Sequence, residues 1–403
     1  MLTRRQFLDT AFQSTSIFSL ASSIPCFLMQ SLQAAESNKH DGRILVVIEL
    51  NGGNDGLNTV VPFTDENYQK YRKTLHLSES IVLKLNPEIG LHPAMTEAAK
   101  LVEDGRLAII QGVGYPNPNR SHFESMAIWQ SAQLSPKAHG GYGWLGRSLD
   151  QKSNRVRTFA DALCLGDVDP PQALRGRLAT QSTIRNIEEL QLDPHAVSLD
   201  TGPVKNSTDD LLQFVRRRTI DARATSARIK KLTNAKQTSV RYPDNGLANR
   251  LKAVARLIRA ELEPRVYYTV QSGYDTHSNQ EFDHYQRLAE FSGALSAFLN
   301  DLRDSQQADR VLVLVFSEFG RRVAENDSQG TDHGTAGPVF LAGPSVKAGL
   351  HGANPNLADL ADGDLKMTTD FRSVYATVLS KWLNINPQKC LNGNFAAMDL
   401  LQS

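Results

Sequence analysis

The sequence predicts an α/β fold of three layers, in which helices cover both faces of a mostly parallel central sheet. Three observations support this prediction. Residues 43–48, 265–271 and 311–316 are apolar runs of strand length, typical of strands that are buried on both faces. An amphipathic helical pattern at 280–304 separates the second run from the third, which indicates a parallel βαβ unit. Each run is followed at once by a loop that contains Asp, Glu or His.

The first 36 residues are expected to be a targeting segment rather than part of the fold. Paired arginines at 4–5, with apolar residues after them, are typical of a twin-arginine signal. The uncharged stretch 11–29 is interrupted by serines and by Pro25, which makes it a poor membrane span. An uncleaved anchor and a lipid anchor at Cys26 remain alternatives. We therefore expect export by the twin-arginine route to the periplasm or beyond, with no stable membrane span after processing.

The remaining residues, 37–403, are expected to form one extended α/β domain with helical decoration at about 151–262. The chain is 40% hydrophobic and 22% charged, which is ordinary for a globular protein. A net charge of +1 gives no reason to expect a nucleic-acid partner. The basic stretch 208–233 suits either a solvated helix face or an anion-binding patch. Cys164 and Cys390 could pair in an exported protein or remain free.

Other elements follow from the same patterns. Short apolar runs predict further buried strands at 107–111 and 338–342. Amphipathic stretches predict helices at 245–262 and 368–384. These elements extend the alternation of strands and helices along the chain, as expected for an α/β sheet.

The loop after the first strand contains Gly52 and Gly53 and then Asp55. Glycines allow the backbone to approach a ligand closely, and Asp55 could bind a metal there. The alternative is a plain turn from strand to helix, in which Asp55 caps the helix.

Two functions are open for Ser121, which follows Arg120 at a predicted helix start. Ser121 could be a helix cap, with Glu124 three residues later completing a capping box. It could instead be an oxygen nucleophile, because the amides and dipole of a helix N-terminus stabilise anions. Arg120 could then help to hold a phosphate or a sulfate.

The loops after the buried strands predict a metal site. The carboxyl ends of parallel strands meet at one edge of the sheet, where α/β folds bind their ligands. Carboxylates and imidazoles are ligands for divalent ions such as Zn, Mn, Mg or Ca. Any one of these residues alone is more simply a cap or a turn residue, but together they indicate one or two metal ions. The candidate ligands are Asp55, Asp275, His277, Glu318, Asp332 and His333.

Six segments in order along the chain resemble the exported family called domain of unknown function 1501, which is itself similar to the alkaline phosphatase and sulfatase superfamily. The resemblance covers essentially the whole chain after the targeting segment and implies an alkaline phosphatase-like fold. The segments are 52–58, 120–123, 273–277, 317–321, 331–334 and 370–375.

The resemblance also implies roles for individual residues. Asp55 would be the ligand after the first strand, and Ser121 the nucleophile at a helix start. Asp275 and His277 would form a middle pair of ligands, and His333 would be a late histidine ligand.

The sequence departs from the superfamily pattern in two places. The middle pair is spaced more closely than in phosphatases. Glu318 stands at the strand end, but Phe319 replaces the histidine expected after it, so one metal loses a nitrogen ligand that Asp332 could replace. No cysteine lies in a setting that suits a formylglycine mechanism.

The predicted function is therefore an exported, metal-dependent hydrolase of phosphate or sulfate esters that uses Ser121 as its nucleophile. The alternative is a non-catalytic exported protein that keeps the fold as a binding or assembly module. The substrate, a small molecule or a polymer, and the oligomeric state are not predicted.

Overall fold

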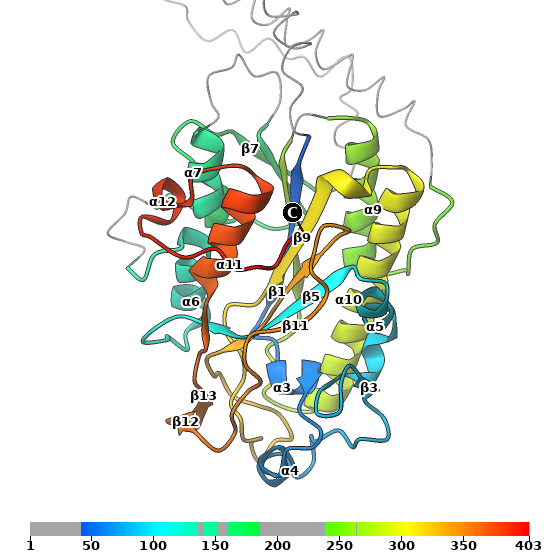
Figure 1. Ribbon diagram of the computed structural model, residues 1–403, viewed down its shortest axis with the longest axis vertical. Coiled ribbons are helices and arrows are strands. Elements are labelled where there is room, and N and C mark those ends of the chain that lie inside the picture. The colour runs from blue at the N-terminus through cyan, green and yellow to red at the C-terminus, as the bar shows by residue number, and fades with distance from the viewer. Residues whose placement is uncertain (1–41, 136–140, 152–159, 186–237, 263, 403) are drawn as a thin grey trace, which may run out of the picture. The chain divides into compact units, whose positions relative to one another are not determined.

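The computed structural model describes residues 42–135, 141–151, 160–185, 238–262 and 264–402. At the centre lies a nine-stranded sheet in the order β11-β5-β10-β9-β1-β8-β6-β7, with β14 paired to β5 (Figure 1). Its strands are β1 (Ile44–Asn51), β5 (Leu107–Gly114), β6 (Ala162–Leu165), β7 (Gln181–Ile184), β8 (Val266–Ser272), β9 (Val311–Phe316), β10 (Gly337–Ala342), β11 (Gly349–His351) and β14 (Thr369–Asp370).

The sheet is mostly parallel, as predicted. Only β10 runs antiparallel to its neighbours β9 and β5, whereas β1 is parallel to both β8 and β9. In register, Ile48 of β1 lies between Thr269 of β8 and Val315 of β9. The strands β1, β5, β8 and β9 therefore end at the same edge of the sheet.

Side chains alternate along the central strands between two hydrophobic cores. In β1, Val46 and Ile48 belong to one core, whereas Leu45 and Val47 belong to the other. All six residues of β9 are buried. Burial of a side chain of this size stabilises the fold by about 1.5–3 kcal/mol, so the continuous apolar run at 311–316 reflects a strand covered on both faces.

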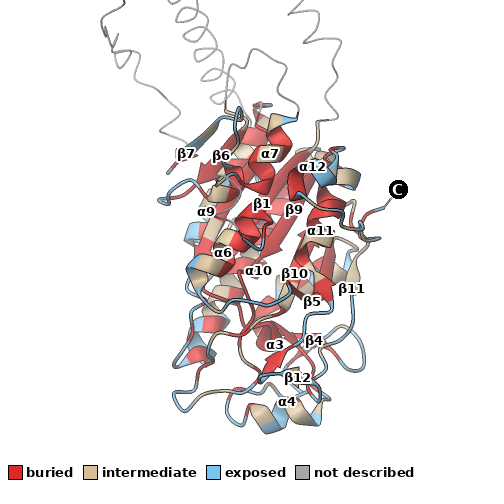
Figure 2. Ribbon diagram, turned by 90° about the vertical axis from the view of Figure 1, so that its left-hand side faces the viewer, coloured by how far each residue is buried: buried red, intermediate tan, exposed pale blue. Residues whose placement is uncertain are grey.

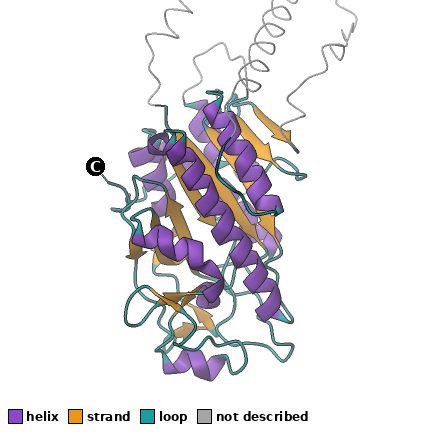
Figure 3. Ribbon diagram, turned by 90° about the vertical axis from the view of Figure 1, so that its right-hand side faces the viewer, coloured by secondary structure: helices purple, strands orange, loops and turns teal. Residues whose placement is uncertain are grey.

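Helices form the two outer layers of the fold. The helices α5, α9 and α10 pack over one face, and α6, α7, α11 and α12 over the other (Figures 1 and 3). The buried strands between them are seen in Figure 2. These helices are α5 (Thr96–Glu103), α6 (His122–Ser131), α7 (Trp144–Asp150), α9 (Gly246–Arg259), α10 (Gln280–Asp304), α11 (Phe371–Thr377) and α12 (Pro387–Leu391).

Smaller elements gather beyond the edge at which β1 ends (Figure 1). They comprise a three-stranded sheet in the order β2-β4-β3, a pair of strands β12 and β13, and two short helices. Their bounds are β2 (Val60–Val61), β3 (Leu83–Lys84), β4 (Gly90–Leu91), β12 (Leu360–Ala361), β13 (Asp364–Leu365), α3 (Gly56–Thr59) and α4 (Glu66–Tyr71).

The predicted decoration at 151–262 needs a correction where the structure describes it. Two short strands, β6 and β7, lie in this region and extend the central sheet beside β8, and α9 packs on the sheet. The segments 1–36 and 208–233 lie outside the described residues. Residues from Arg43 onward cluster into one compact unit. Cys164 and Cys390 are both buried and free, so they form no disulfide with each other.

Candidate metal centre

Four loops meet at the edge where β1, β5, β8 and β9 end, and two glycines allow this close approach. Gly52 and Gly53 both have positive φ, at 120° and 77°. A Cβ atom on Gly52 would lie 2.4 Å from the backbone nitrogen of Asp275, and one on Gly53 would lie 2.3 Å from the ring of Phe319. Only glycine fits both the backbone conformation and the space at these positions.

Three imidazoles and one carboxylate converge in this region, and we call His122, Asp275, His277 and His333 the His/Asp cluster. The Nε2 atom of His333 lies 3.0 Å from Nε2 of His122 and 2.9 Å from Nε2 of His277. The Oδ1 atom of Asp275 lies 3.0 Å, 3.2 Å and 3.5 Å from the Nε2 atoms of His277, His333 and His122. Ligand atoms around a tetrahedral zinc ion are about 3.3 Å apart, so these separations suit a divalent cation.

The other ring nitrogen of each histidine faces an oxygen acceptor. The Nδ1 atoms of His122 and His277 lie 2.7 Å and 2.9 Å from carboxylate oxygens of Glu318 and Asp332. Nδ1 of His333 lies 2.7 Å from the backbone oxygen of Arg120. An ionised carboxylate or a backbone oxygen can only accept, so each Nδ1 donates to its oxygen, and the Nε2 atoms of His122 and His277 both face Nε2 of His333. Imidazole nitrogens at this separation can hold either a shared proton or a cation between them.

The charges around the cluster keep its carboxylate ionised. Partial burial alone would raise the pKa of Asp275, but the hydrogen bond and the charge of Arg321 lower that pKa to about 2. The Glu318 hydrogen bond raises the pKa of His122 despite its partial burial. The cluster also remains open to solvent, since the side chains of Asp275 and His277 are 50% and 44% exposed.

Arg321 fixes the loops that supply the cluster. Its buried guanidinium donates to backbone oxygens of Gly52, Gly53, Tyr274 and Thr331 and to Oδ1 of Asp275, the last at 2.6 Å. A planar guanidinium can hold several acceptors at once, so this single side chain connects three of the converging loops.

Phe319 forms an apolar wall beside two of the imidazoles. Its ring centroid lies 4.9 Å from that of His122 and 5.0 Å from that of His333. Phe319 stands where the superfamily pattern has a histidine ligand. It offers no donor atom, and its ring instead restricts the two neighbouring imidazoles.

The predicted ligands divide into three groups. Asp275, His277 and His333 bring donor atoms together. Glu318 and Asp332 lie behind the cluster and accept hydrogen bonds from imidazole rings, which corrects their prediction as direct ligands. Glu318 is fully buried, and its Oε1 also accepts from the backbone of Gly52 at 2.9 Å. Carboxylates in such positions orient metal-binding histidines and raise their basicity.

Asp55 is not part of the cluster, which corrects the prediction that it binds a metal. It is 1% exposed and caps α3 by accepting from the backbone nitrogens of Leu57 and Asn58. Its two oxygens are also paired with the guanidinium of Arg72, and Gln280 donates to it. The cation beside Asp55 is therefore an arginine of the chain itself, and the alternative interpretation as a helix cap is confirmed.

His122 was not among the predicted ligands. It lies at the first position of α6, directly after Ser121, in the loop that follows β5. The rule that the loops after parallel strands meet at one edge applies to this loop as well, and it could have identified the residue.

Ser121 and Arg120 lie beside the cluster but differ in their contacts. The backbone oxygen of Arg120 accepts from His333, whereas its guanidinium is paired with the carboxylates of Asp362 and Asp364 and is directed to these side chains of the chain itself. Ser121 is the exposed first residue before α6 and makes no side-chain capping bond, contrary to the expected capping box.

Comparison with known sequences assigns the family. The family described as "Protein of unknown function (DUF1501)" matches residues 43–394. The chain belongs to this family. The sequence of this DUF1501 member matches no curated protein.

Solved structures similar to this DUF1501 protein include enzymes of the alkaline phosphatase and sulfatase superfamily. A sulfatase from Pseudoalteromonas sp. is 10% identical with a TM-score of 0.40, covering 92% of this chain and 72% of its own. A protein in the alkaline phosphatase superfamily from Vibrio parahaemolyticus is 10% identical with a TM-score of 0.35, covering 81% and 69%. A lipoteichoic acid synthase from Listeria monocytogenes is 9% identical with a TM-score of 0.34, covering 81% and 74%. Likenesses this weak transfer no substrate or reaction, so the fold class rests on the strand order and layers described above.

Within the described ranges, no helix of this DUF1501 member has both the length and the apolar content needed to span a bilayer.

Proposed function

We propose that the protein is an exported, metal-dependent hydrolase of phosphate or sulfate esters. The observation that supports this most is that donor atoms of His122, Asp275 and His333 all lie within 4.8 Å of one another, with Nε2 of His277 2.9 Å from Nε2 of His333. His122, Asp275, His277 and His333 would hold a single divalent cation. A cation bound there would act as a Lewis acid toward an oxygen of the ester.

The residues behind the cluster would prepare it for binding. Glu318 and Asp332 hold two rings in the tautomer that presents Nε2, and the backbone oxygen of Arg120 does the same for His333. Arg321 holds the Asp275 carboxylate at its place. The half-exposed position of Asp275 and His277 leaves a path for a substrate from solvent.

Ser121 is our proposed nucleophile. It lies between Arg120, whose backbone oxygen accepts from His333, and His122 of the cluster, and its hydroxyl is not used to cap the ten-residue helix α6. Attack by its oxygen would form a bond to phosphorus or sulfur as the bond to the ester oxygen breaks, and the proton lost by the hydroxyl would be balanced by one that solvent delivers to the leaving alcohol. Water would then cleave the seryl ester and regenerate Ser121.

Two measurements on the protein without its targeting segment test this function. Elemental analysis is expected to find a divalent metal, and His277→Ala is expected to lower the metal content and the melting temperature. Turnover of 4-nitrophenyl phosphate and 4-nitrophenyl sulfate is expected to be lost in Ser121→Ala, with metal content unchanged. His351→Ala, on β11, serves as the matched control.

Different outcomes would exclude different parts of the proposal. A wild-type protein that takes up no metal, together with an unchanged melting curve for His277→Ala, would remove the metal centre. A metal-loaded protein without turnover of any ester would favour the non-catalytic binding module. Turnover that persists in Ser121→Ala would remove the serine from the mechanism and retain the rest.

A further inference from the structure

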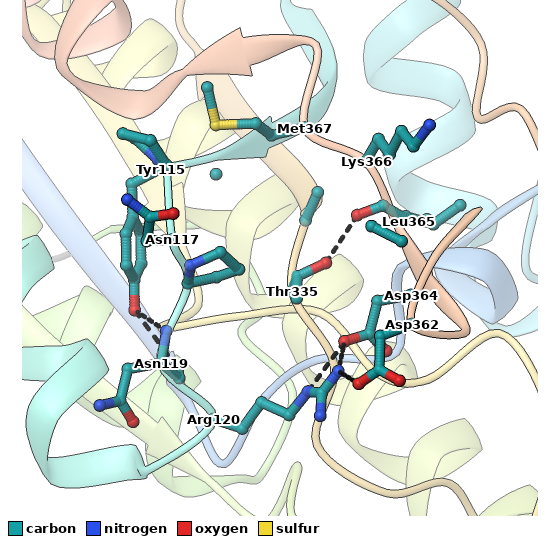
Figure 4. A pocket seen from close by; sticks show the side chains of 15 residues that line it. Tyr115, Asn117, Asn119, Arg120, Thr335, Asp362, Asp364, Leu365, Lys366 and Met367 are labelled. Carbon is teal, nitrogen blue, oxygen red and sulfur yellow. Dashed lines mark hydrogen bonds and ion pairs between the residues drawn. The ribbon is translucent and has the colours of Figure 1, made fainter. Parts of the chain in front are cut away.

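A pocket of about 710 Å³ adjoins the His/Asp cluster. One wall is the segment 114–120 and the other is the segment 361–367, with Thr335 between them (Figure 4). Arg120 connects the pocket to the cluster, because its side chain lines the pocket while its backbone oxygen accepts from His333. The proposed nucleophile, Ser121, is the next residue in the chain. A substrate group held in this pocket would therefore lie next to the proposed reaction site.

The charges of the side chains that line the pocket sum to zero. Arg120 is paired with both Asp362 and Asp364, at 2.9 Å and 2.5 Å. The fourth charged lining residue, Lys366, is paired with Asp359. Two cations and two anions among the lining residues give no preference for a polyanion or a polycation. The occupant is therefore expected to be neutral.

The walls of the pocket combine apolar surface with hydrogen-bonding groups. Apolar contact is offered by Pro116, Pro118 and Met367, which are exposed, whereas Tyr115 and Leu365 are buried behind them. Polar groups are offered by Asn117, Asn119, Thr335 and Asp362, and the Asp362 side chain is 80% exposed. A purely apolar occupant would cover such groups without replacing their hydrogen bonds to water, which is unfavourable.

Hydrogen bonds and ion pairs hold the walls of the pocket in place. The Tyr115 hydroxyl donates to Ser125 at 2.9 Å and accepts from the backbone nitrogen of Asn119 at 3.0 Å. On the other side, the Thr335 hydroxyl donates to the backbone oxygen of Leu365 at 2.6 Å. The ion pairs of Arg120 join the two walls. A ligand would thus enter a site that is already formed, which lowers the entropy cost of binding.

We infer that this pocket binds a neutral ring rich in hydroxyl groups, namely the sugar part of a phosphate or sulfate ester. A sugar ring has apolar C–H faces for the proline and methionine surfaces. It also has hydroxyl groups for the carboxylate and amide groups. This inference rests on the proposed function for the statement that the sugar is the alcohol part of an ester. Binding of the sugar itself does not depend on turnover.

Saturation-transfer NMR on the protein without its targeting segment tests the inference. The probes are the methyl glycosides of glucose, galactose, mannose and fucose, with phenol as the apolar competitor. At least one glycoside is expected to receive saturation from the protein. Asp362→Ala is expected to weaken its binding about tenfold, because a hydrogen bond to a charged group is lost. Ala361→Trp is expected to block binding by filling the pocket.

Two matched variants make the result interpretable. Asp359→Ala removes a nearby exposed carboxylate that does not line the pocket, and it is expected to bind the glycoside as the wild type does. His277→Ala removes a residue of the His/Asp cluster and should also retain glycoside binding. If His277→Ala binds the glycoside but no ester is turned over by the wild type, the hydrolase proposal fails and the sugar pocket stands.

Three outcomes would overturn the sugar pocket. The first is the absence of transfer to every glycoside with folded wild-type protein. The second is binding of phenol without any glycoside. The third is glycoside binding that is equal in the wild type, Asp362→Ala and Ala361→Trp. Turnover of an aryl ester that persists alongside any of these outcomes would leave the hydrolase proposal intact.

Discussion

Asp55 and Asp275 follow neighbouring parallel strands and lie at the same edge of the sheet, yet their surroundings differ. Asp55 is 1% exposed, caps α3 and is paired with the guanidinium of Arg72. The Asp275 side chain is 50% exposed and faces three imidazole nitrogens as well as Arg321. The first carboxylate has its countercharge fully supplied by the chain. The second shares one arginine with imidazole nitrogens that a proton or a further cation can bridge.

This difference shows what separates a structural acid from a candidate ligand. Both residues follow a buried strand and a glycine-containing loop. The deciding feature is the partner brought by a distant segment, because a buried carboxylate is retained only when it is paired. The end of α4 supplies an arginine to Asp55, whereas the loops after β5 and β9 supply histidines to Asp275.

The largest effect is expected at the buried pair. Arg72→Ala would leave the Asp55 carboxylate buried without its partner and should lower the free energy of unfolding by about 3–5 kcal/mol. Denaturant unfolding followed by circular dichroism measures this change. Lys84→Ala removes half of an exposed pair with Glu79 and should cost no more than about 1 kcal/mol. Equal, small effects of both variants would mean that Asp55 does not depend on an internal countercharge.

The next effect concerns the cation proposed for the His/Asp cluster. Zinc at about one hundred times its Kd should raise the free energy of unfolding of the wild type by about 2.7 kcal/mol. His333→Ala removes the nitrogen that contacts two other rings, so its unfolding should be insensitive to zinc. His351→Ala should respond as the wild type does. If the unfolding of the wild type is insensitive to added zinc, manganese, magnesium and calcium, then Asp275, like Asp55, takes no cation from outside the chain.

A smaller effect is expected for the carboxylates behind the cluster. Glu318→Gln should weaken metal binding about 10–100-fold, because the amide holds the His122 ring less strongly. Asp332→Asn should have the weaker effect, because the Asp332 side chain is 57% exposed and solvent can replace its hydrogen bond. Isothermal titration with zinc measures both. The reverse order would show that burial of Glu318 does not contribute to ring orientation.

The smallest effect is expected at Ser121. A serine that caps a helix costs about 1 kcal/mol when it is replaced by alanine. Because the Ser121 side chain makes no capping bond, Ser121→Ala should change the free energy of unfolding by less than about 0.5 kcal/mol. Asn245 caps α9 through its side chain, with a 2.8 Å bond from the backbone nitrogen of Ala248, so Asn245→Ala should cost about 1 kcal/mol. A loss in Ser121→Ala as large as in Asn245→Ala would restore the capping role.

Local pattern was enough to predict the elements that build the site. The apolar run at 311–316 became β9 and the amphipathic run at 280–304 became α10, with the predicted bounds. In both cases the spacing of apolar side chains within the segment indicates which of its faces are buried, so the segment's own sequence is enough to predict the element. The antiparallel direction of β10 was not predicted, because a short apolar run contains no information on strand direction.

Within the candidate site, the sequence located the loops more reliably than it predicted the role of each residue in them. Asp275, His277 and His333 were predicted ligands and have converging donor atoms. Glu318 and Asp332 were predicted as ligands too, but they face the Nδ1 side of imidazoles. Which oxygen or nitrogen turns toward a shared point depends on side-chain orientation across several loops, and spacing along the chain does not specify it.

By itself the sequence determined the α/β fold class, the sheet edge at which polar loops gather, and the residue types that could bind a cation there. These properties follow from the periodicity of apolar residues and from the shared direction of parallel strands. Only the tertiary structure decided that Arg72 neutralises Asp55, that His122 completes the His/Asp cluster and that Arg120 faces the pocket. The physical reason is that the energy of a charge or a lone pair depends on which groups surround it in space, and those groups come from distant parts of the chain.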